Sequence, residues 1–399
     1  MSRFLGATGA RLPRWLLPEN WPLVNNQPQL ATLHFHASGL QFEPTNASQP
    51  AGYLALHGAL VLPAFVEPHA HLDKTFTIER SPAQQPGLLA AIAAMHQDRV
   101  HWNAEDLQQR ATQALHWAAE AGVGLLRTHI DWFSVDAPLA WQVMGDLHHP
   151  LCSIERVALA PLPFFTDASD AQHIAAQVAT SGPGALLGGF IHSSNWDAQA
   201  FQRLLDAAER WQLDVDLHID EELNPQAQGL RWLAHYLQQH PFSGQITCSH
   251  SCALSQQDDA EQILAVLAQH KVRLIALPLT NLLLQDAVPG RTPRQRGLTL
   301  VKEAQALGIP LLLGADNVQD AFCPFGSYDP LDTLFSGLLS LQLGAAFDEA
   351  SALICQRRAL QGNDLVIFPD ADVASWPLRQ RQRYRLKNGV RYGETTNGA

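Results

Sequence analysis

Short hydrophobic runs alternate with longer amphipathic segments from about residue 60 to residue 316. Eight strands are expected, over Val61–Glu67, Gly124–His129, Glu155–Leu159, Leu187–His192, Asp214–His218, Gln245–His250, Val272–Leu277 and Pro310–Gly314. Between them, segments rich in Ala, Leu, Gln and Glu predict helices, for example over Ala104–Ala121, Ala198–Trp211, Gln226–Gln239 and Ala260–Gln269. Eight strand–helix units favour an α/β fold closed into a (β/α)8 barrel over an open sheet.

Both ends of the chain carry a different pattern, with short alternating stretches broken by Gly, Pro and Asn. These stretches lie within Leu33–Leu62 and Asp364–Gly393 and are typical of strands joined by tight turns. We expect them to pair into one small β-domain. The chain would then divide into a barrel over residues 61–359 and a β-domain over residues 1–60 and 360–399.

Composition and charge narrow the classes of partner. With 46% hydrophobic residues, a chain of 399 residues can bury a full-sized core. Its formal net charge of −12 disfavours nucleic acid and anionic membrane as partners, since both attract basic surfaces. No apolar run reaches the length of a membrane helix, and no secretory leader pattern is recognised at the N-terminus. The five scattered cysteines do not resemble a disulfide framework, so we expect a cytoplasmic protein with reduced thiols.

Ionisable residues gather where the expected strands end. The first strand runs into Pro68–Lys74, in which His69 and His71 are two residues apart and face the same side of a strand. An H-x-H pair is weak evidence in a chain with 18 histidines. Three further strands end at or near His218, His250 and Asp316. Each ending alone also fits a loop histidine or a helix cap, but the carboxyl ends of barrel strands build active sites, and together the endings favour one site.

Three imidazoles and one carboxylate make a suitable ligand set for a single divalent metal ion, either zinc or ferrous iron, with one position left for water. Water on such a metal becomes acidic enough to supply hydroxide near neutral pH. Glu221 lies three residues beyond His218 and is not needed as a ligand. It is therefore free to carry a proton.

An ordered set of motifs resembles the cytosine deaminase branch of the amidohydrolase superfamily. The resemblance runs from about residue 55 to the C-terminus and includes Thr292–Gly297 and Val301–Glu303. The motifs that carry it are Val66–Asp73, Arg127–Asp131, His218–Glu221, Ser249-His250 and Gly314–Asn317.

This resemblance implies a role for each motif residue. His69, His71, His218 and Asp316 would bind the metal, and His250 would orient hydroxide and stabilise the intermediate. The implied reaction is attack of metal-bound hydroxide on an amidine-like ring carbon. Asp316 would accept the proton from water, Glu221 would protonate a ring nitrogen, and ammonia would leave. Ordinary pKa values permit neutral imidazoles beside an ionised Glu221 before the attack.

The fourth expected strand favours one metal rather than two. Superfamily members with two metals usually bridge them through a carboxylated lysine in this strand, and Leu187–Ser194 contains no lysine. His192, at the end of the strand, is either a substrate contact or a hydrogen-bonded structural histidine.

Three positions depart from the cytosine deaminase pattern or leave a role open. Leu162 stands where that branch has a glutamine that reads the pyrimidine edge, and Asn317 stands where it has a carboxylate that binds the ring. Neither side chain supplies the same hydrogen bonds, which disfavours cytosine itself as the substrate. Phe322 matches an aromatic wall. Lys74 either binds a substrate oxygen or is simply solvated.

The sequence thus predicts a mononuclear metal-dependent hydrolase that deaminates an amino-substituted N-heterocycle of pyrimidine, pterin or triazine type. Two alternatives remain at the same site. One is hydrolysis of a cyclic amide or lactam, and the other is a barrel that binds a heterocycle without turning it over. The expected partner is a small heterocyclic molecule, and family analogy adds a possible homo-oligomer.

Overall fold

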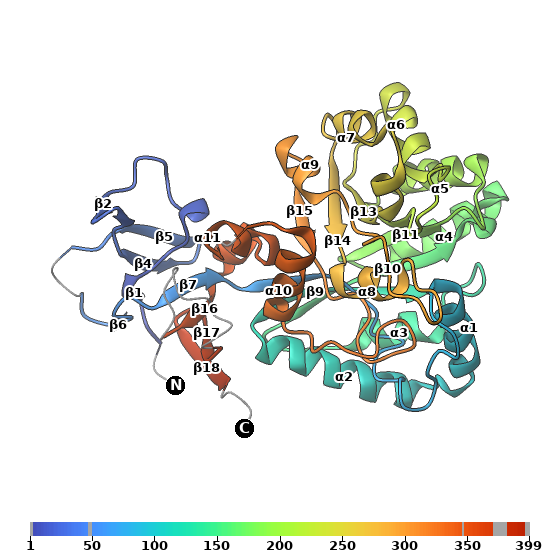
Figure 1. The fold of residues 1–399 in the computed structure, drawn as a ribbon. Coiled ribbons are helices and arrows are strands. Elements are labelled where there is room, and N and C mark those ends of the chain that lie inside the picture. Colours follow the sequence, from blue (N-terminus) through green and yellow to red (C-terminus); the bar gives the residue numbers. More distant parts are fainter. Residues whose placement is uncertain (1–2, 47–49, 345–346, 370–380, 396–399) are drawn as a thin grey trace.

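An eight-stranded parallel sheet forms the centre of the larger lobe in Figure 1. The computed structural model describes all residues except 1–2, 47–49, 345–346, 370–380 and 396–399. The strands lie side by side in chain order: β8 (Phe65–Ala70), β9 (Val123–Asp131), β10 (Ser153–Pro161), β11 (Ala185–Ile191), β12 (Val215–Ile219), β13 (Ile246–His250), β14 (Val272–Ala276) and β15 (Leu311–Leu313). A parallel bridge between Ala70 and Asp316 joins the first strand to the segment after the last. The expected (β/α)8 barrel is confirmed.

Amphipathic helices cover the outside of the barrel (Figure 1). In α5 (Ala198–Trp211), the buried side chains recur every three or four residues, and the Asp197 carboxylate caps the first turn by accepting backbone N–H bonds from Gln199 and Ala200. The other helices are α1 (Leu88–Asp98), α2 (Ala104–Glu120), α3 (Leu139–Asp146), α4 (Ala168–Thr180), α6 (Gly229–Gln239), α7 (Ala260–Leu267), α8 (Pro278–Leu284), α9 (Val301–Ala306), α10 (Pro330–Leu341) and α11 (Phe347–Ala350). Within the described part of the chain, no helix is long and apolar enough to cross a membrane.

The smaller lobe is built from two four-stranded sheets. One contains β1 (Gly6–Ala10), β4 (Ala31–His36), β5 (Gly39–Pro44) and β6 (Tyr53–Ala55), with a short hairpin of β2 (Leu23–Val24) and β3 (Gln27–Pro28) nearby in sequence. The other contains β7 (Leu60–Pro63), β16 (Asp364–Phe368), β17 (Arg383–Lys387) and β18 (Val390–Thr395). Leu33 from the first sheet and Leu365 and Leu386 from the second share one buried core. The expected β-domain from both chain ends is confirmed, while its residue boundaries remain a prediction.

The first expected strand, Val61–Glu67, is divided between the two lobes. Its first part is β7, which pairs with β16, and its second part begins β8 of the barrel at Phe65. Pro63 has no backbone N–H and ends β7, and Ala64 connects the two strands. A continuous apolar run does not reveal where a chain crosses between sheets. As a result His69 lies within β8 rather than after it.

Candidate metal centre and catalytic cavity

Four predicted ligands converge at the carboxyl end of the barrel. His69 lies in β8, His71 directly follows β8, His218 lies in β12 and Asp316 follows β15. Nε2 of His218 lies 3.1 Å from Nε2 of His69 and 3.2 Å from Nε2 of His71. Oδ1 of Asp316 lies 3.3 Å and 3.1 Å from the same two His69 and His71 nitrogens. The structure therefore brings the predicted ligand set together around one point.

The second ring nitrogens of two ligands are held by neighbours. Nδ1 of His71 lies 3.2 Å from the carbonyl oxygen of His129, and Nδ1 of His69 lies 2.9 Å from Oγ of Ser249. With Nδ1–H donating to the His129 carbonyl, Nε2 of His71 keeps its lone pair for a metal.

The cluster fits a bound cation. Both carboxylate oxygens of Asp316 are buried, and neither has a hydrogen-bond donor in good geometry among the described residues. Unsatisfied buried carboxylate oxygens and imidazole nitrogens at such short separations are costly without an ion between them. One donor atom from each of His69, His218, His250 and Asp316 lies within 4.8 Å of the others, so this second set could also hold an ion, with His250 in place of His71. The two sets share three residues, and the short contacts of His71 favour it over His250 as the fourth ligand.

Burial sets the charges of these groups. It lowers the pKa of His69 to about 4 and holds the pKa values of His71 and His218 well below the usual range, so all three rings are neutral at neutral pH. Burial alone would raise the pKa of the Asp316 carboxyl, but the His69 and His71 rings outweigh it and hold the pKa well below its usual range. Neutral imidazoles with an ionised carboxylate are the forms that bind a divalent metal.

Glu221 and His250 lie beside the cluster, close to each other. Oε1 of Glu221 is 3.3 Å from Nδ1 of His250, and Asn281 donates its side-chain N–H to the same Nδ1 at 3.0 Å. Burial, followed by the Asp316 charge, raises the pKa of Glu221 well above its usual range, which differs from the expectation of an ordinary value. The expectation failed because sequence does not show how completely a carboxyl is removed from water.

Several residues around the cluster adopt left-handed backbone conformations that are rare for residues other than glycine. Asp220, His250 and Asp316 have φ values of 53°, 68° and 63°, and Ser251 has 53°. All of them stand where a strand gives way to a loop. Strained backbone of this kind is typical of functional sites, because the surrounding fold holds side chains in directions that a relaxed loop would not.

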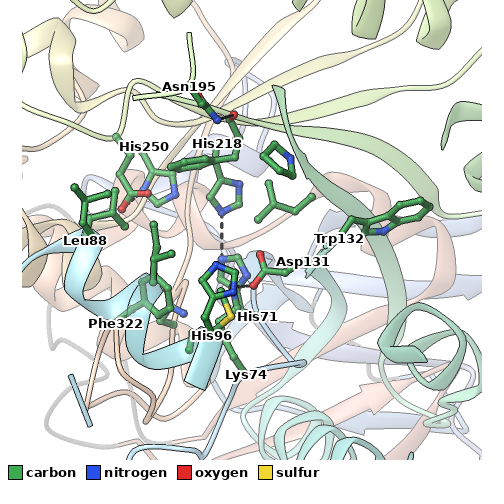
Figure 2. Close-up of a pocket in the computed structure, with 18 of the residues that line it drawn as sticks. His71, Lys74, Leu88, His96, Asp131, Trp132, Asn195, His218, His250 and Phe322 are labelled. Atoms are coloured by element: carbon green, nitrogen blue, oxygen red, sulfur yellow. Dashed lines mark hydrogen bonds and ion pairs between the residues drawn. The ribbon is translucent and has the colours of Figure 1, made fainter. Parts of the chain in front are cut away.

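A cavity of about 310 Å³ opens beside the cluster (Figure 2). Part of its wall is formed by His71, His218, Glu221, His250 and Asp316. Apolar and aromatic side chains form most of the remaining wall: Leu88, Leu89, Ile92 and Met95 from or beside α1, and Trp132, Phe133, Leu159, Pro161, Phe190 and Phe322. Lys74, Asp131, Asn195 and Asn317 add polar groups. Such a cavity suits a flat ring with a few hydrogen-bonding edges.

The structure places three of the five predicted substrate contacts at the cavity. Lys74, Asn317 and Phe322 line it. Leu162 does not, because it begins a short 3-10 helix (Leu162–Phe165) and is fully buried in the barrel core. His192 is also absent from the lining; its ring stacks on Phe190 and its Nε2 lies 3.7 Å from the Glu222 carboxylate. Leu159, Pro161 and Phe190 from the same two strands reach the cavity instead.

Sequence reasoning missed a buried polar network next to the cluster of proposed ligands. The His129 ring stacks on His69 with centroids 3.8 Å apart, and its Nε2 lies 3.1 Å from Asp216 Oδ1. Asp216 also pairs with Arg127 at 2.7 Å, and Arg127 with Glu155 at 2.7 Å. Arg127 and His129 alternate along β9 and so share the barrel interior. The available signal was the Arg127–Asp131 motif, whose residues had no assigned role.

Comparisons with known proteins agree with this geometry. Residues 155–361 match the amidohydrolase family. A curated pterin deaminase from Rhizobium rhizogenes is 32% identical over 306 residues, which cover 75% of this chain and 69% of that protein. N-isopropylammelide isopropyl amidohydrolase from Pseudomonas sp. strain ADP is 25% identical over 282 residues, covering 68% of this chain and 66% of that protein.

Solved structures show the same fold. The structure of 5-methylcytosine deaminase from Klebsiella pneumoniae, liganded with 5-fluorocytosine, superposes with a TM-score of 0.81 at 24% identity, covering 99% of this chain and 98% of that chain. The expected amidohydrolase membership is confirmed, as is a hydrolase that acts on carbon–nitrogen bonds other than peptide bonds, and the fold is the one seen in a 5-methylcytosine deaminase. The barrel, the convergent histidines and the shared sequence together place this chain in the amidohydrolase family.

Proposed function

We propose that this protein is a mononuclear metal-dependent deaminase of an amino-substituted N-heterocycle, with aminopteridines of pterin type as the preferred class. The observation that carries the proposal is the convergence of His69, His71, His218 and Asp316 beside Glu221 and His250 at the wall of an aromatic cavity. A binding protein has no use for a proton-carrying carboxyl and an imidazole beside a metal cluster.

A single zinc or ferrous ion, held by the four proposed ligands, would lower the pKa of water and so provide the nucleophile near neutral pH. In the overall reaction, water adds to the ring carbon that bears the amino group, the carbon–nitrogen bond breaks, and the products are an oxo-heterocycle and ammonia. Asp316, held ionised by its neighbours, is suited to take the proton from water.

Glu221 is suited to the opposite task. Burial and the nearby Asp316 charge raise its pKa well above the usual range, which favours the protonated form that can donate to a ring nitrogen of the substrate. His250 accepts the Asn281 N–H at Nδ1, so Nε2 carries the proton. That Nε2–H has no hydrogen-bond partner among the described residues and can hold the attacking oxygen in position.

Two observations support a pterin-type substrate over cytosine. The cavity wall is aromatic and apolar around a volume of about 310 Å³, which accommodates a two-ring system. In addition, the relative that is 32% identical over most of this chain is a pterin deaminase.

The test is a panel of aminopteridines, aminopyrimidines and amino-s-triazines, incubated with zinc- or iron-loaded protein and assayed for released ammonia. We expect ammonia from aminopteridines and little or none from cytosine. Hydrolysis of a cyclic amide would open the ring without releasing ammonia, so ring opening detected by mass spectrometry would replace the deaminase proposal with that alternative.

A further inference from the structure

Lys74 places a buried ammonium group at the cavity wall, next to the metal cluster but outside it. Its side chain is about 5% exposed, and Nζ lies 2.5 Å from Oδ2 of Asp131. Both residues line the cavity, where Figure 2 shows them side by side. Removing an ammonium and a carboxylate from water usually costs more than their pairing returns, so such a pair adds little to stability. An ion pair in the wall of a ligand cavity is therefore better explained by a role in binding the ligand than by a role in stability.

The backbone fixes both partners in place. Nη1 of Arg110 donates to the carbonyl oxygens of Asp73 and Thr75, each at 2.9 Å, and Oγ1 of Thr77 donates to the Lys74 carbonyl at 2.8 Å. The backbone N–H of Asp131 donates to Oδ2 of Asp73 at 2.9 Å. The two charged groups are thus presented from rigid backbone, which is the arrangement that ligand recognition requires.

The pair keeps unused hydrogen-bonding capacity toward the cavity. Asp131 is the only carboxylate within ion-pair distance of the Lys74 ammonium in the described part of the chain. The ammonium has three N–H donors, and its approach to Oδ2 of Asp131 leaves that buried oxygen without a well-aligned hydrogen bond. Burial alone would lower the pKa of Lys74, but Asp131 and Asp73 raise it overall, so the amine stays charged at neutral pH.

We infer that Lys74 and Asp131 together bind the edge of the heterocycle at which a ring carbonyl adjoins a ring N–H. The inference rests on the proposed function and narrows its substrate class to amino-oxo heterocycles. The ammonium donates to the carbonyl oxygen and the carboxylate accepts the N–H, two groups that neighbouring ring atoms present side by side. The Phe322 ring, 5.1 Å from Lys74 Nζ, provides an apolar face for the bound ring. Lys74 and Asp131 would thus supply the hydrogen bonds to the ring edge that the buried Leu162 side chain does not supply.

Matched pairs of probes test the inference with the metal-loaded enzyme. One pair is 2-amino-4-oxopteridine and 2-aminopteridine, and the other is isocytosine and 2-aminopyrimidine. We expect the wild type to favour the oxo member of each pair by roughly 100-fold in kcat/KM, and Lys74→Met to lose most of this preference, chiefly through KM. Asp131→Asn, which keeps the side-chain size, should lose part of it. Metal content should stay unchanged in both variants.

The exposed residues Lys302 and Asp258 supply matched controls, Lys302→Met and Asp258→Asn. An equal rate on both members of each pair in the wild type would overturn the inference and leave the deaminase proposal intact. The same holds if Lys74→Met keeps the preference and loses only thermal stability, as a purely structural ion pair would. If no probe is deaminated, the proposed function fails. The inference about Lys74 and Asp131 is then tested by calorimetry, which measures how tightly 2,4-dioxopteridine binds to the wild type and to Lys74→Met. Binding that is equally tight to the wild type and to Lys74→Met would then contradict it.

Discussion

Oε1 of Glu221, on the loop that follows β12, lies 3.3 Å from Nδ1 of His250, the last residue of the neighbouring strand β13. The contact joins a carboxyl with a raised pKa to an imidazole whose pKa burial lowers to about 3. The His250 ring is therefore neutral near neutral pH, and the environment of Glu221 favours its protonated form. The difference between the two pKa shifts supports the proposed roles, with Glu221 as the proton donor and His250 as the group that orients the attacking oxygen.

Replacing Glu221 with Gln removes the proton donor and keeps the shape of the side chain. We expect Glu221→Gln to retain its metal while kcat falls by roughly 10²- to 10⁴-fold. The neighbouring Glu222→Gln is the matched control, because the Glu222 carboxylate accepts the Ser193 N–H and does not line the cavity. Steady-state kinetics with metal analysis checks this, and unimpaired turnover in Glu221→Gln would remove the residue from its role.

His218 carries the ring nitrogen that approaches both other proposed histidine ligands. We expect His218→Ala to lose stoichiometric metal and, with it, measurable hydrolysis, whereas the exposed His235→Ala keeps both. Elemental analysis of the purified proteins measures the metal directly. A His218→Ala protein with full metal content and activity would contradict the assigned ligand set.

Asp216 contacts His129, whose ring stacks on the proposed metal ligand His69. Partners of this kind orient ligands, and their loss typically weakens metal binding about 10- to 100-fold. We expect Asp216→Asn to show this weakening in competition titrations with a chelator, while the exposed Asp258→Asn does not. Equal metal affinity in Asp216→Asn and the wild type would limit Asp216 to packing the barrel.

Glu67 predicts a pH dependence of stability. Burial raises its pKa from 4.5 to about 8 although its carboxylate accepts backbone N–H bonds from His69 and Ala315. Between these two pH values the unfolded chain has released the proton and the folded chain keeps it. The unfolded state therefore binds fewer protons, and the free energy of unfolding falls as pH rises through this window.

We expect metal-free wild type to lose on the order of a few kcal/mol more than Glu67→Gln between pH 5 and pH 8. Denaturant titrations at both pH values measure the difference, with the exposed Glu43→Gln as a control. Identical pH slopes for the wild type and Glu67→Gln would show that Glu67 is not the group that holds the proton.

The sequence was informative wherever the buried side chains follow the regular period of a strand or a helix. The eight barrel strands and the helix Ala198–Trp211 were expected from local patterns, and the grouping of His69, His71, His218 and Asp316 was implied by the family resemblance. Contacts between residues that are far apart in the sequence could not be predicted from local patterns. Leu162 was aligned with a recognition residue by position in the chain, yet the 3-10 turn after β10 rotates it into the core. The Lys74–Asp131 pair joins two strand ends 57 residues apart, and no local pattern indicates it.

The barrel closes through one bridge, between Ala70 and Asp316, with the Asp316 N–H donating to the His69 carbonyl oxygen at 2.9 Å. His69 and His71 stand on one side of this seam and Asp316 on the other. A metal bound by all three would link the first and last strands, which the described residues join by an isolated bridge rather than by a ladder of paired residues. The free energy of metal binding would then also hold the first and last strands together. Removal of the metal should therefore increase local opening first between β8 and β15.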